Sequence, residues 1–240
     1  MVVEFGLLVL GGYLLGAVPA AYLVAKWSQG IDIRKYGSGN VGASNLLKLT
    51  SKRLAIPVII FDIGKGTAMV GVAQWLGLGI AEQVTVGIAA IIGHNWPVFL
   101  RFVGGRGILT TAGILFILTP KLALIASVLS LLFAPFRQLA LGVFIVLASI
   151  PILSWFLSQP LGIGERLPIT LGYLAMFLLV VIRRLAAPRT SVTSSVSLGQ
   201  LLLNRLLFDR DIRDREAWIR QTRLQAGSAE QLPKQQGKGN

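Results

Sequence analysis

The chain has 240 residues, of which 54% are hydrophobic, and a formal net charge of +13. A mean hydropathy of +0.70 and several apolar runs that reach or approach the roughly 20 residues needed to cross a bilayer exclude a soluble globular domain. Without cysteine there are no disulfides or thiolates, and a single histidine makes a transition-metal site unexpected. The cations lie mostly in short loops and in the C-terminal region, as the positive-inside rule predicts, so we expect no nucleic-acid partner.

Seven apolar segments are predicted to be membrane helices. They are Phe5–Ala25, Leu54–Leu78, Gln83–Leu100, Gly107–Thr119, Lys121–Ala134, Leu139–Leu157 and Leu167–Ile182. The first is interpreted as a retained span, because Glu4 stands where a signal peptide carries positive charge. At 1.5 Å per residue, the fourth and fifth each fall short of a bilayer core of about 30 Å. One longer helix kinked at Pro120 is therefore the alternative.

Loop charges favour seven spans. The stretch Lys26–Arg53 carries six cations and one acid, which places it in the cytoplasm and the N-terminus outside. Arg101 and Arg106 after the third segment and Arg183 after the last also require the inside. Only an even number of membrane crossings between Arg106 and Arg183 places both residues on the inside. Pro120 then lies at an external turn. We therefore expect an all-α integral membrane protein with about seven transmembrane helices, an outer N-terminus and a cytoplasmic C-terminus.

The chain changes character after its last apolar segment. Residues 1–185 form the predicted membrane domain, and residues 186–200 are a Ser/Thr-rich linker. Residues 201–223 interleave apolar and charged side chains at helical spacing, which is typical of an amphipathic helix, here on the cytoplasmic side. The composition of residues 224–240 predicts a disordered tail.

Three glycine-rich polar segments, here called the polar islands, interrupt the apolar chain. The first is Tyr36–Asn45, the second is Phe61–Thr67, and the third is Gly93–Pro97 together with Gly104–Gly107. In the seven-span topology all three approach the cytoplasmic face. We therefore expect them to form one site.

The first polar island has the composition of an anion site. It matches G-x-G-x-x-G formally, but a membrane segment precedes it instead of a strand, which excludes a dinucleotide fold. Glycines let successive backbone amides converge on an anion, and hydroxyl, amide and cationic side chains add donors. An ordinary turn between two helices is the alternative. The candidate ligands are Arg34, Gly39, Asn40, Gly42, Asn45 and Lys48, with Ser38 beside them.

The second polar island places Asp62 and Lys65 three residues apart in an apolar helix. A self-neutralising structural pair is one interpretation. Ionisable side chains inside a span are nevertheless costly and often functional. Lys65 stands between two glycines, which would leave it accessible to a phosphate. The segment lacks the spacing of a nucleotide-binding P-loop.

The third polar island contains His94, the single histidine, followed by Gly104, Gly105, Arg106 and Gly107. Imidazole exchanges protons easily near neutral pH, whereas a hydrogen-bonded packing residue is the plainer interpretation. Arg106 can bind a phosphate through a bidentate fork, and the glycines would add backbone donors. A simple positive-inside anchor is the alternative for Arg106.

Together, Gly30–Asn45, Phe61–Gly66 and Gly93–Gly107 resemble the signatures of the bacterial acyl-phosphate:glycerol-3-phosphate acyltransferase family. The resemblance covers residues 1–185 in order and spacing. It implies a multi-pass enzyme of the bacterial cell membrane, with seven spans and an active site facing the cytoplasm. Such an enzyme transfers an acyl group from acyl phosphate to the 1-hydroxyl of glycerol 3-phosphate, giving lysophosphatidic acid and phosphate. It uses no metal, acyl-CoA or other cofactor, and we expect no protein partner.

The resemblance also implies residue roles. Acyl phosphate is already activated, so positioning and charge neutralisation can supply much of the rate. We expect Ser38 to hydrogen-bond the reacting groups, with a nucleophilic role as the alternative. His94 would position a substrate or transfer a proton. Lys65, Arg106 and the glycine and asparagine donors would hold phosphates.

Two departures from the family pattern stand out. Arg106 replaces a usual lysine. In the C-terminal signature, roughly Asn-Ile-x-Arg-Leu-Leu followed by Gly and Glu, residues 205–207 and Asp211 align, but Leu202 replaces the Asn and Asp209 the Gly. These departures leave a non-catalytic membrane binding or transport protein for a phosphorylated small molecule as the alternative function.

Overall fold

The computed structural model describes residues 2–187, 196–214 and 216–218. Within these ranges the chain is helical and contains no strand. Two short 3₁₀ turns, η1 (Ile33–Lys35) and η2 (Val98–Leu100), lie in the loops after α2 and α5. The helices are α1 (Val2–Ala17), α2 (Ala20–Gln29), α3 (Ala43–Leu49), α4 (Lys52–Trp75), α5 (Ile80–Asn95), α6 (Ile108–Leu118), α7 (Pro120–Leu131), α8 (Leu139–Phe156), α9 (Ser158–Leu161), α10 (Arg166–Leu185) and α11 (Leu198–Phe208).

Five helical stretches in the described chain are long and apolar enough to cross a membrane. Large apolar side chains point outward along them; Leu7, Ile60 and Ile152, for example, are 64%, 65% and 59% exposed. The all-α membrane fold is therefore confirmed, whereas the count of seven spans and the sides of the termini stay predictions. The five stretches are Val2–Gln29, Lys52–Trp75, Ile80–Leu100, Leu139–Phe156 and Arg166–Leu185.

The fourth and fifth predicted segments are two separate helices, α6 and α7, of 11 and 12 residues. Thr119 between them has φ −142° and ψ 71°, outside the helical region. Pro120 begins α7, where its missing N–H leaves no helical hydrogen bond unmade. The alternative of one long helix kinked at Pro120 is therefore wrong.

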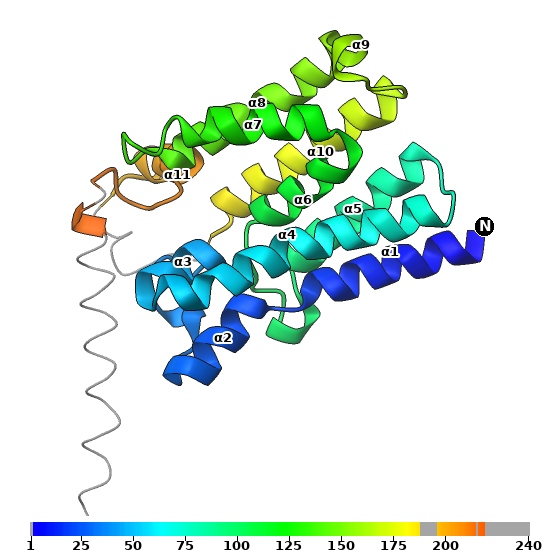
Figure 1. Cartoon of the computed structure of the whole chain (residues 1–240). Coiled ribbons are helices and arrows are strands. Elements are labelled where there is room, and N and C mark those ends of the chain that lie inside the picture. The colour runs from blue at the N-terminus through cyan, green and yellow to red at the C-terminus, as the bar shows by residue number, and fades with distance from the viewer. Residues whose placement is uncertain (1, 188–195, 215, 219–240) are drawn as a thin grey trace, which may run out of the picture.

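The first apolar segment, expected as one helix over Phe5–Ala25, is broken into α1 and α2 at Val18–Pro19 (Figure 1). Proline has no N–H to donate, and its ring disfavours the helical conformation at the preceding residue. The break leaves carbonyls at the end of α1, among them that of Gly16, without partners in their own helix. Side chains from other helices can therefore bind them.

Glycines let α1 and α5 approach closely. A Cβ added at Gly16 would overlap the backbone of Ala90, and one at Gly93 would overlap the backbone of Tyr13. Small residues at such contacts are typical of membrane helices, whose packing depends on close van der Waals contact. The close approach brings the end of α1 beside His94.

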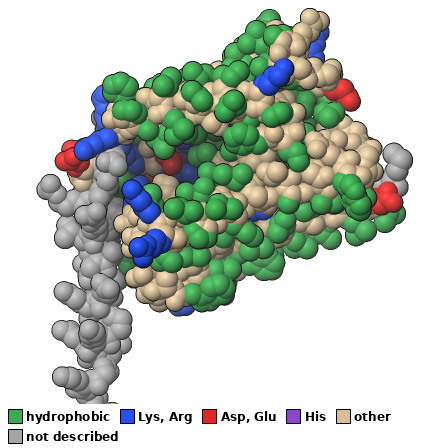
Figure 2. Space-filling view, viewed as in Figure 1, with side chains coloured by type: hydrophobic (Ala, Val, Ile, Leu, Met, Phe, Trp, Pro, Cys, Tyr) green, Lys and Arg blue, Asp and Glu red, His purple; other side chains and the backbone are tan. Residues whose placement is uncertain are grey.

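The two ends of the bundle differ in character. The N-terminus, α9 and the turn between α4 and α5 lie at one end in Figure 1, and α2, α3 and α11 lie at the other, here called the polar end. Figure 2 shows hydrophobic side chains over the flank and most of the visible Lys and Arg side chains near the polar end. The main apolar core includes Ile91, Ile114, Ile150 and Tyr173 and packs α4 to α8 and α10 together. The polar end has an apolar cluster of its own, which includes Ile33 and Leu46.

The C-terminal region differs from the expected helix over 201–223. Helix α11 already begins at Leu198, inside the expected linker, and ends at Phe208 because Asp209 adopts a left-handed conformation with φ 60°. Asn204, Arg205 and Asp211 are buried, so this segment docks onto α10 instead of presenting a fully hydrated polar face. The expected tail, 224–240, lies outside the described residues.

Candidate active site

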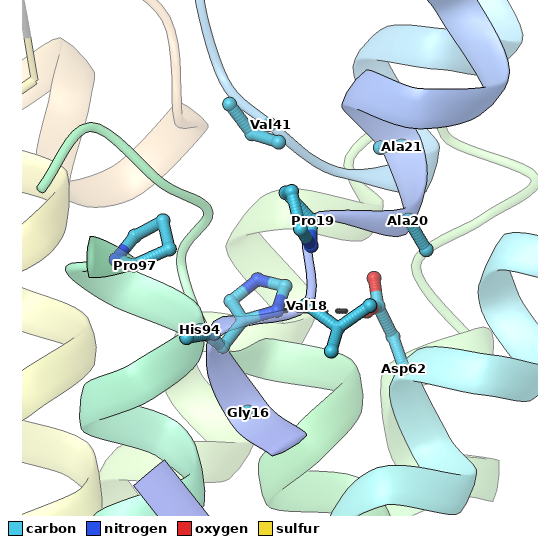
Figure 3. Close-up of a pocket in the computed structure, with 10 residues that line it drawn as sticks. Gly16, Val18, Pro19, Ala20, Ala21, Val41, Asp62, His94 and Pro97 are labelled. Atoms are coloured by element: carbon cyan, nitrogen blue, oxygen red, sulfur yellow. Dashed lines mark ion pairs between the residues drawn. The ribbon is translucent and has the colours of Figure 1, made fainter. Parts of the chain in front are cut away.

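One small pocket lies at the break between α1 and α2, near the polar end. Val41 comes from the first polar island, Asp62 from the second, and His94 and Pro97 from the third, so each island contributes to the wall of this pocket. That the islands form one functional site stays a prediction. Figure 3 shows Asp62 and His94 facing each other beside the broken helix. Sequence reasoning missed the contribution of the break itself, although Pro19 inside an apolar run was the available signal. The full lining is Gly16, Ala17, Val18, Pro19, Ala20, Ala21, Val41, Asp62, His94 and Pro97.

Beside the pocket, Lys65 forms a buried polar cluster with Asp62 and His94. Its Nζ lies 2.9 Å from Asp62 Oδ1, 2.7 Å from His94 Nδ1 and 3.0 Å from the carbonyl oxygen of Gly16. The side chains of Lys65 and Asp62 are only 1% and 3% exposed, and a charge removed from water requires such partners. Lys65 therefore faces its own helix and its neighbours, contrary to the expectation that it is open to a phosphate.

The glycine-rich part of the third island covers His94. The amide of Gly105 donates to the His94 carbonyl oxygen at 2.9 Å, and a Cβ at Gly105 would overlap the imidazole ring. Arg183 of α10 donates from Nε to the Gly105 carbonyl and from Nη2 to the Gly104 carbonyl, both at 2.9 Å. Gly107 has φ 71°, a conformation that favours glycine. The backbone of Gly104, Gly105 and Gly107 thus packs over His94, and the two hydrogen bonds from Arg183 hold it there. In the sequence, Arg183 was interpreted only as a signal of membrane topology.

Arg106 is engaged within the protein. Its guanidinium forms an ion pair with Asp209, the residue that ends α11. The other Asp209 oxygen lies 3.6 Å from Nε of Arg184. Asp209 had no predicted role, but 106 and 209 are both positions at which the chain departs from the family signature. The structure shows that these two departures are partners, since the carboxylate of one neutralises the cation of the other.

Just before the first island, Arg34 of η1 is held by Asp32 through Nε and Nη2, at 2.9 and 2.7 Å, and donates to the Leu100 carbonyl at 3.3 Å. The guanidinium lowers the pKa of the Asp32 carboxyl through this hydrogen bond, and the carboxylate raises the pKa of Arg34. Arg34 therefore ties η1, which precedes the first island, to η2, which lies between the two parts of the third island. Its guanidinium, expected from the sequence to bind an anion, therefore already has partners within the protein.

Asn45 organises the first island from inside. It is 1% exposed, its Nδ2 donates toward the carbonyls of Tyr36 at 3.0 Å and Asn40 at 3.1 Å, and its Oδ1 accepts from the Ser38 amide at 3.2 Å. A buried amide with such partners is a scaffold group, unlike the ligand expected from sequence. Gly39 follows Ser38 with φ 66°.

The remaining candidates of the first island lie on either side of this scaffold. Ser38, Gly39 and Asn40 are half-buried on the turn, and Gly42 is buried where α3 begins. Lys48 is exposed on α3. Within the described residues, no group of three His, Cys, Asp or Glu side chains could hold a metal ion.

The protein is a polytopic membrane protein with an internal polar site. Its apolar spans enclose buried ion pairs, and glycine-rich turns lie at one end of the bundle. The family model described as glycerol-3-phosphate acyltransferase matches residues 6–191. The chain belongs to this family and is an acyltransferase.

Named relatives cover most of the chain. A glycerol-3-phosphate acyltransferase 4 of Dehalococcoides mccartyi is 46% identical over 90% of this chain and 93% of its own length. The glycerol-3-phosphate acyltransferase of Pseudomonas paraeruginosa is 43% identical over 68% and 85%, respectively. The crystal structure of the integral membrane glycerol 3-phosphate acyltransferase PlsY, in its glycerol 3-phosphate form, superposes with a TM-score of 0.68 at 29% identity, covering 75% of this chain and 88% of that one. The chain is thus an integral membrane protein, like its structural neighbour.

Proposed function

We propose that the protein transfers an acyl group from an acyl phosphate to the 1-hydroxyl of glycerol 3-phosphate, giving lysophosphatidic acid and inorganic phosphate. Its family membership supports this reaction, as do the neighbouring PlsY structures in glycerol 3-phosphate and lysophosphatidic acid forms. The product would feed phospholipid synthesis. The same membership favours an enzyme over the alternative of a non-catalytic binding or transport protein.

The observation that carries the proposal is the convergence of all three polar islands on one pocket. Both substrates contain a phosphate, and two glycine-rich turns, around Gly39 and Gly105, lie on the elements that line this pocket. The amides of Gly39 and Gly105 themselves donate to the carbonyls of Tyr36 and His94, so the other donors of these two turns would bind the phosphates. The pocket lies beside apolar spans, and the acyl chain of the donor would enter from the lipid around them.

The chemistry balances without a cofactor. The 1-hydroxyl oxygen attacks the acyl carbonyl carbon, the bond from that carbon to the phosphate oxygen breaks, and the leaving phosphate takes the hydroxyl proton. We propose that Ser38 hydrogen-bonds the reacting groups and that His94 lies beside the same groups. Arg106 would bind a substrate phosphate in exchange for the Asp209 carboxylate, since a guanidinium pairs equally well with phosphate.

The topology proposed with this function is a multi-pass protein of a bacterial cell membrane, with its active site facing the cytoplasm. The separate helices α6 and α7 support seven crossings, with the N-terminus outside and the C-terminus in the cytoplasm. The cations gathered at the polar end support the cytoplasmic placement of that end.

The test uses the full-length protein, purified in detergent and given palmitoyl phosphate with and without glycerol 3-phosphate. We expect phosphate release that depends on glycerol 3-phosphate, with matching lysophosphatidic acid. Ser38→Ala and His94→Ala should each lower turnover at least about tenfold, within the range for positioned polar groups. Ser28→Ala is the matched control, because Ser28 is exposed on α2 and bonds only its own helix.

Two results would overturn the proposal. A folded protein that makes no lysophosphatidic acid with several acyl chain lengths would remove the reaction. Uptake of radiolabelled glycerol 3-phosphate into vesicles without lipid formation would restore the transport alternative. Unchanged turnover in both variants would remove only the assignment of Ser38 and His94.

A further inference from the structure

The Lys65 ammonium has as many acceptors around it as it has hydrogens. An ammonium carries three N–H donors and no lone pair. Asp62 Oδ1, the Gly16 carbonyl oxygen and His94 Nδ1 lie at 2.9, 3.0 and 2.7 Å. Lys65 is paired with the Asp62 carboxylate as an ammonium, and an ammonium can only donate, so each of the three atoms accepts one of its hydrogen bonds.

This arrangement determines which nitrogen of His94 carries a proton. Nδ1 accepts from an ammonium, so it holds a lone pair, and a neutral imidazole with a bare Nδ1 carries its proton on Nε2. An imidazolium would direct its Nδ1–H at a cation 2.7 Å away, while Asp62 is farther, at 3.5 Å. Arg183, bonded to the Gly104 and Gly105 carbonyls, adds another positive charge on the glycine side. The neighbourhood therefore favours the neutral ring with Nε2–H.

The protonated nitrogen lies on the side of the glycine cover. A Cβ at Gly105 would overlap Nε2, so the backbone of Gly105 lies directly against it. Figure 3 shows one ring nitrogen turned toward Asp62 and the other turned away from it. The ring itself is only 9% exposed, so it cannot rotate without displacing its neighbours.

We infer that Asp62 and Lys65 are positioning residues that hold His94 as the Nε2–H tautomer, with this donor presented beside Gly105. Lys65 donates to Nδ1, and Asp62 holds Lys65 in place. On the proposed function, His94 then donates a hydrogen bond to a phosphate or carbonyl oxygen. It does not act as the general base, because Nε2 is already protonated, which agrees with the leaving phosphate taking the hydroxyl proton.

The experiment is direct because His94 is the only histidine in the chain. The full-length protein, purified through an affinity tag without histidine and labelled with nitrogen-15 histidine, gives one imidazole in a nitrogen NMR spectrum. We expect at neutral pH one protonated nitrogen, assigned to Nε2, and one bare nitrogen, assigned to Nδ1. A spectrum of the Nδ1–H tautomer or of an imidazolium would overturn the inference.

Variants separate positioning from mere stability. In Lys65→Met the donor to His94 Nδ1 is lost, so the spectrum should show a mixture of the two tautomers. The same variant should lower kcat of the proposed reaction with little change in KM for glycerol 3-phosphate. Since Lys65→Met leaves Asp62 buried without its cation, the double variant Asp62→Asn/Lys65→Met removes both charges and retains the volume. Lys52→Met, an exposed lysine of the same helix, is the control and should leave the spectrum unchanged.

An unaltered tautomer in the folded double variant would also overturn the inference. If neither variant folds, the spectrum of the unmodified protein decides alone. The result is independent of turnover: a fixed Nε2–H tautomer in an inactive protein would contradict only the proposed function, and a different tautomer in an active enzyme only this inference.

Discussion

Replacing Asp209 by Asn is expected to strengthen phosphate binding. Asp209 ends α11 in a left-handed conformation, which Asn tolerates, so the substitution keeps shape and backbone and removes one charge. That charge is paired with Arg106 and lies near Arg184. If Arg106 binds a substrate phosphate, it has to leave this carboxylate first. Asn competes with the incoming phosphate much less than Asp does.

The size of the effect follows from how well the pair is shielded. The side chains of Arg106 and Asp209 are 10% and 16% exposed, so water reaches one edge of the pair. A hydrogen bond to a charged group contributes about 1.5–3 kcal/mol, and partial hydration reduces this to about 1–2 kcal/mol. Because about 1.4 kcal/mol is tenfold in a binding constant, we expect phosphate to bind roughly 5- to 30-fold more tightly.

The assay measures formation of labelled lysophosphatidic acid from glycerol 3-phosphate, with inorganic phosphate as an added inhibitor. Asp209→Asn should lower the inhibition constant of phosphate and the KM for a phosphate-bearing substrate, whereas Arg106→Ala should raise both. Glu216→Gln is the matched control, because its exposed ion pair with Arg137 contributes little. Unchanged or weaker phosphate inhibition in a folded Asp209→Asn protein would refute the idea that a substrate phosphate replaces the Asp209 carboxylate at Arg106.

Two further predictions concern packing and pH. Gly66→Ala should destabilise the protein by about 1–3 kcal/mol, because a Cβ there would lie 2.5 Å from the Thr110 carbonyl oxygen; Gly64→Ala, with open space around it, should be neutral or stabilise α4 by up to about 1 kcal/mol. Thermal unfolding in detergent compares them, and equal midpoints would contradict the close contact of α4 with α6. The lowered pKa of Asp32 means that its ion pair with Arg34 stabilises the fold fully above the unfolded value of about 3.9 and is lost as the pH falls through the folded value. Asp32→Asn should therefore lower the midpoint at pH 6, and this difference should shrink as the pH falls below about 4; a constant difference across that range would contradict the prediction.

Much of the fold could be predicted because membrane-spanning segments can be recognised from short stretches of sequence. Apolar length identified the five stretches that are long enough to cross a membrane, and the proline at position 120 marked a real boundary. The count of seven spans and the sides of the termini, which were inferred from loop charge, stay predictions. Pro19 carried the same signal, but it lay inside an apolar run long enough to span a membrane alone, and the break at Val18 was missed. The C-terminal segment was misjudged for another reason. Its alternating charges suit a hydrated helix equally well, and only the structure shows that Arg205 donates to the carbonyls of Leu185, the last residue of α10, and of Ala187 after it.

The sequence by itself determined that this is a multi-pass membrane protein whose polar islands meet in one place, since apolar length, glycine spacing and loop charge are properties of short segments. It also identified the acyltransferase family, because the signatures are contiguous. Only the tertiary structure decided what each polar group binds. Lys65 meets Gly16 and His94 across 49 and 29 residues, and Arg106 meets Asp209 across 103. A cation in an apolar segment must find a partner, but helix packing chooses whether that partner is a substrate or the protein itself.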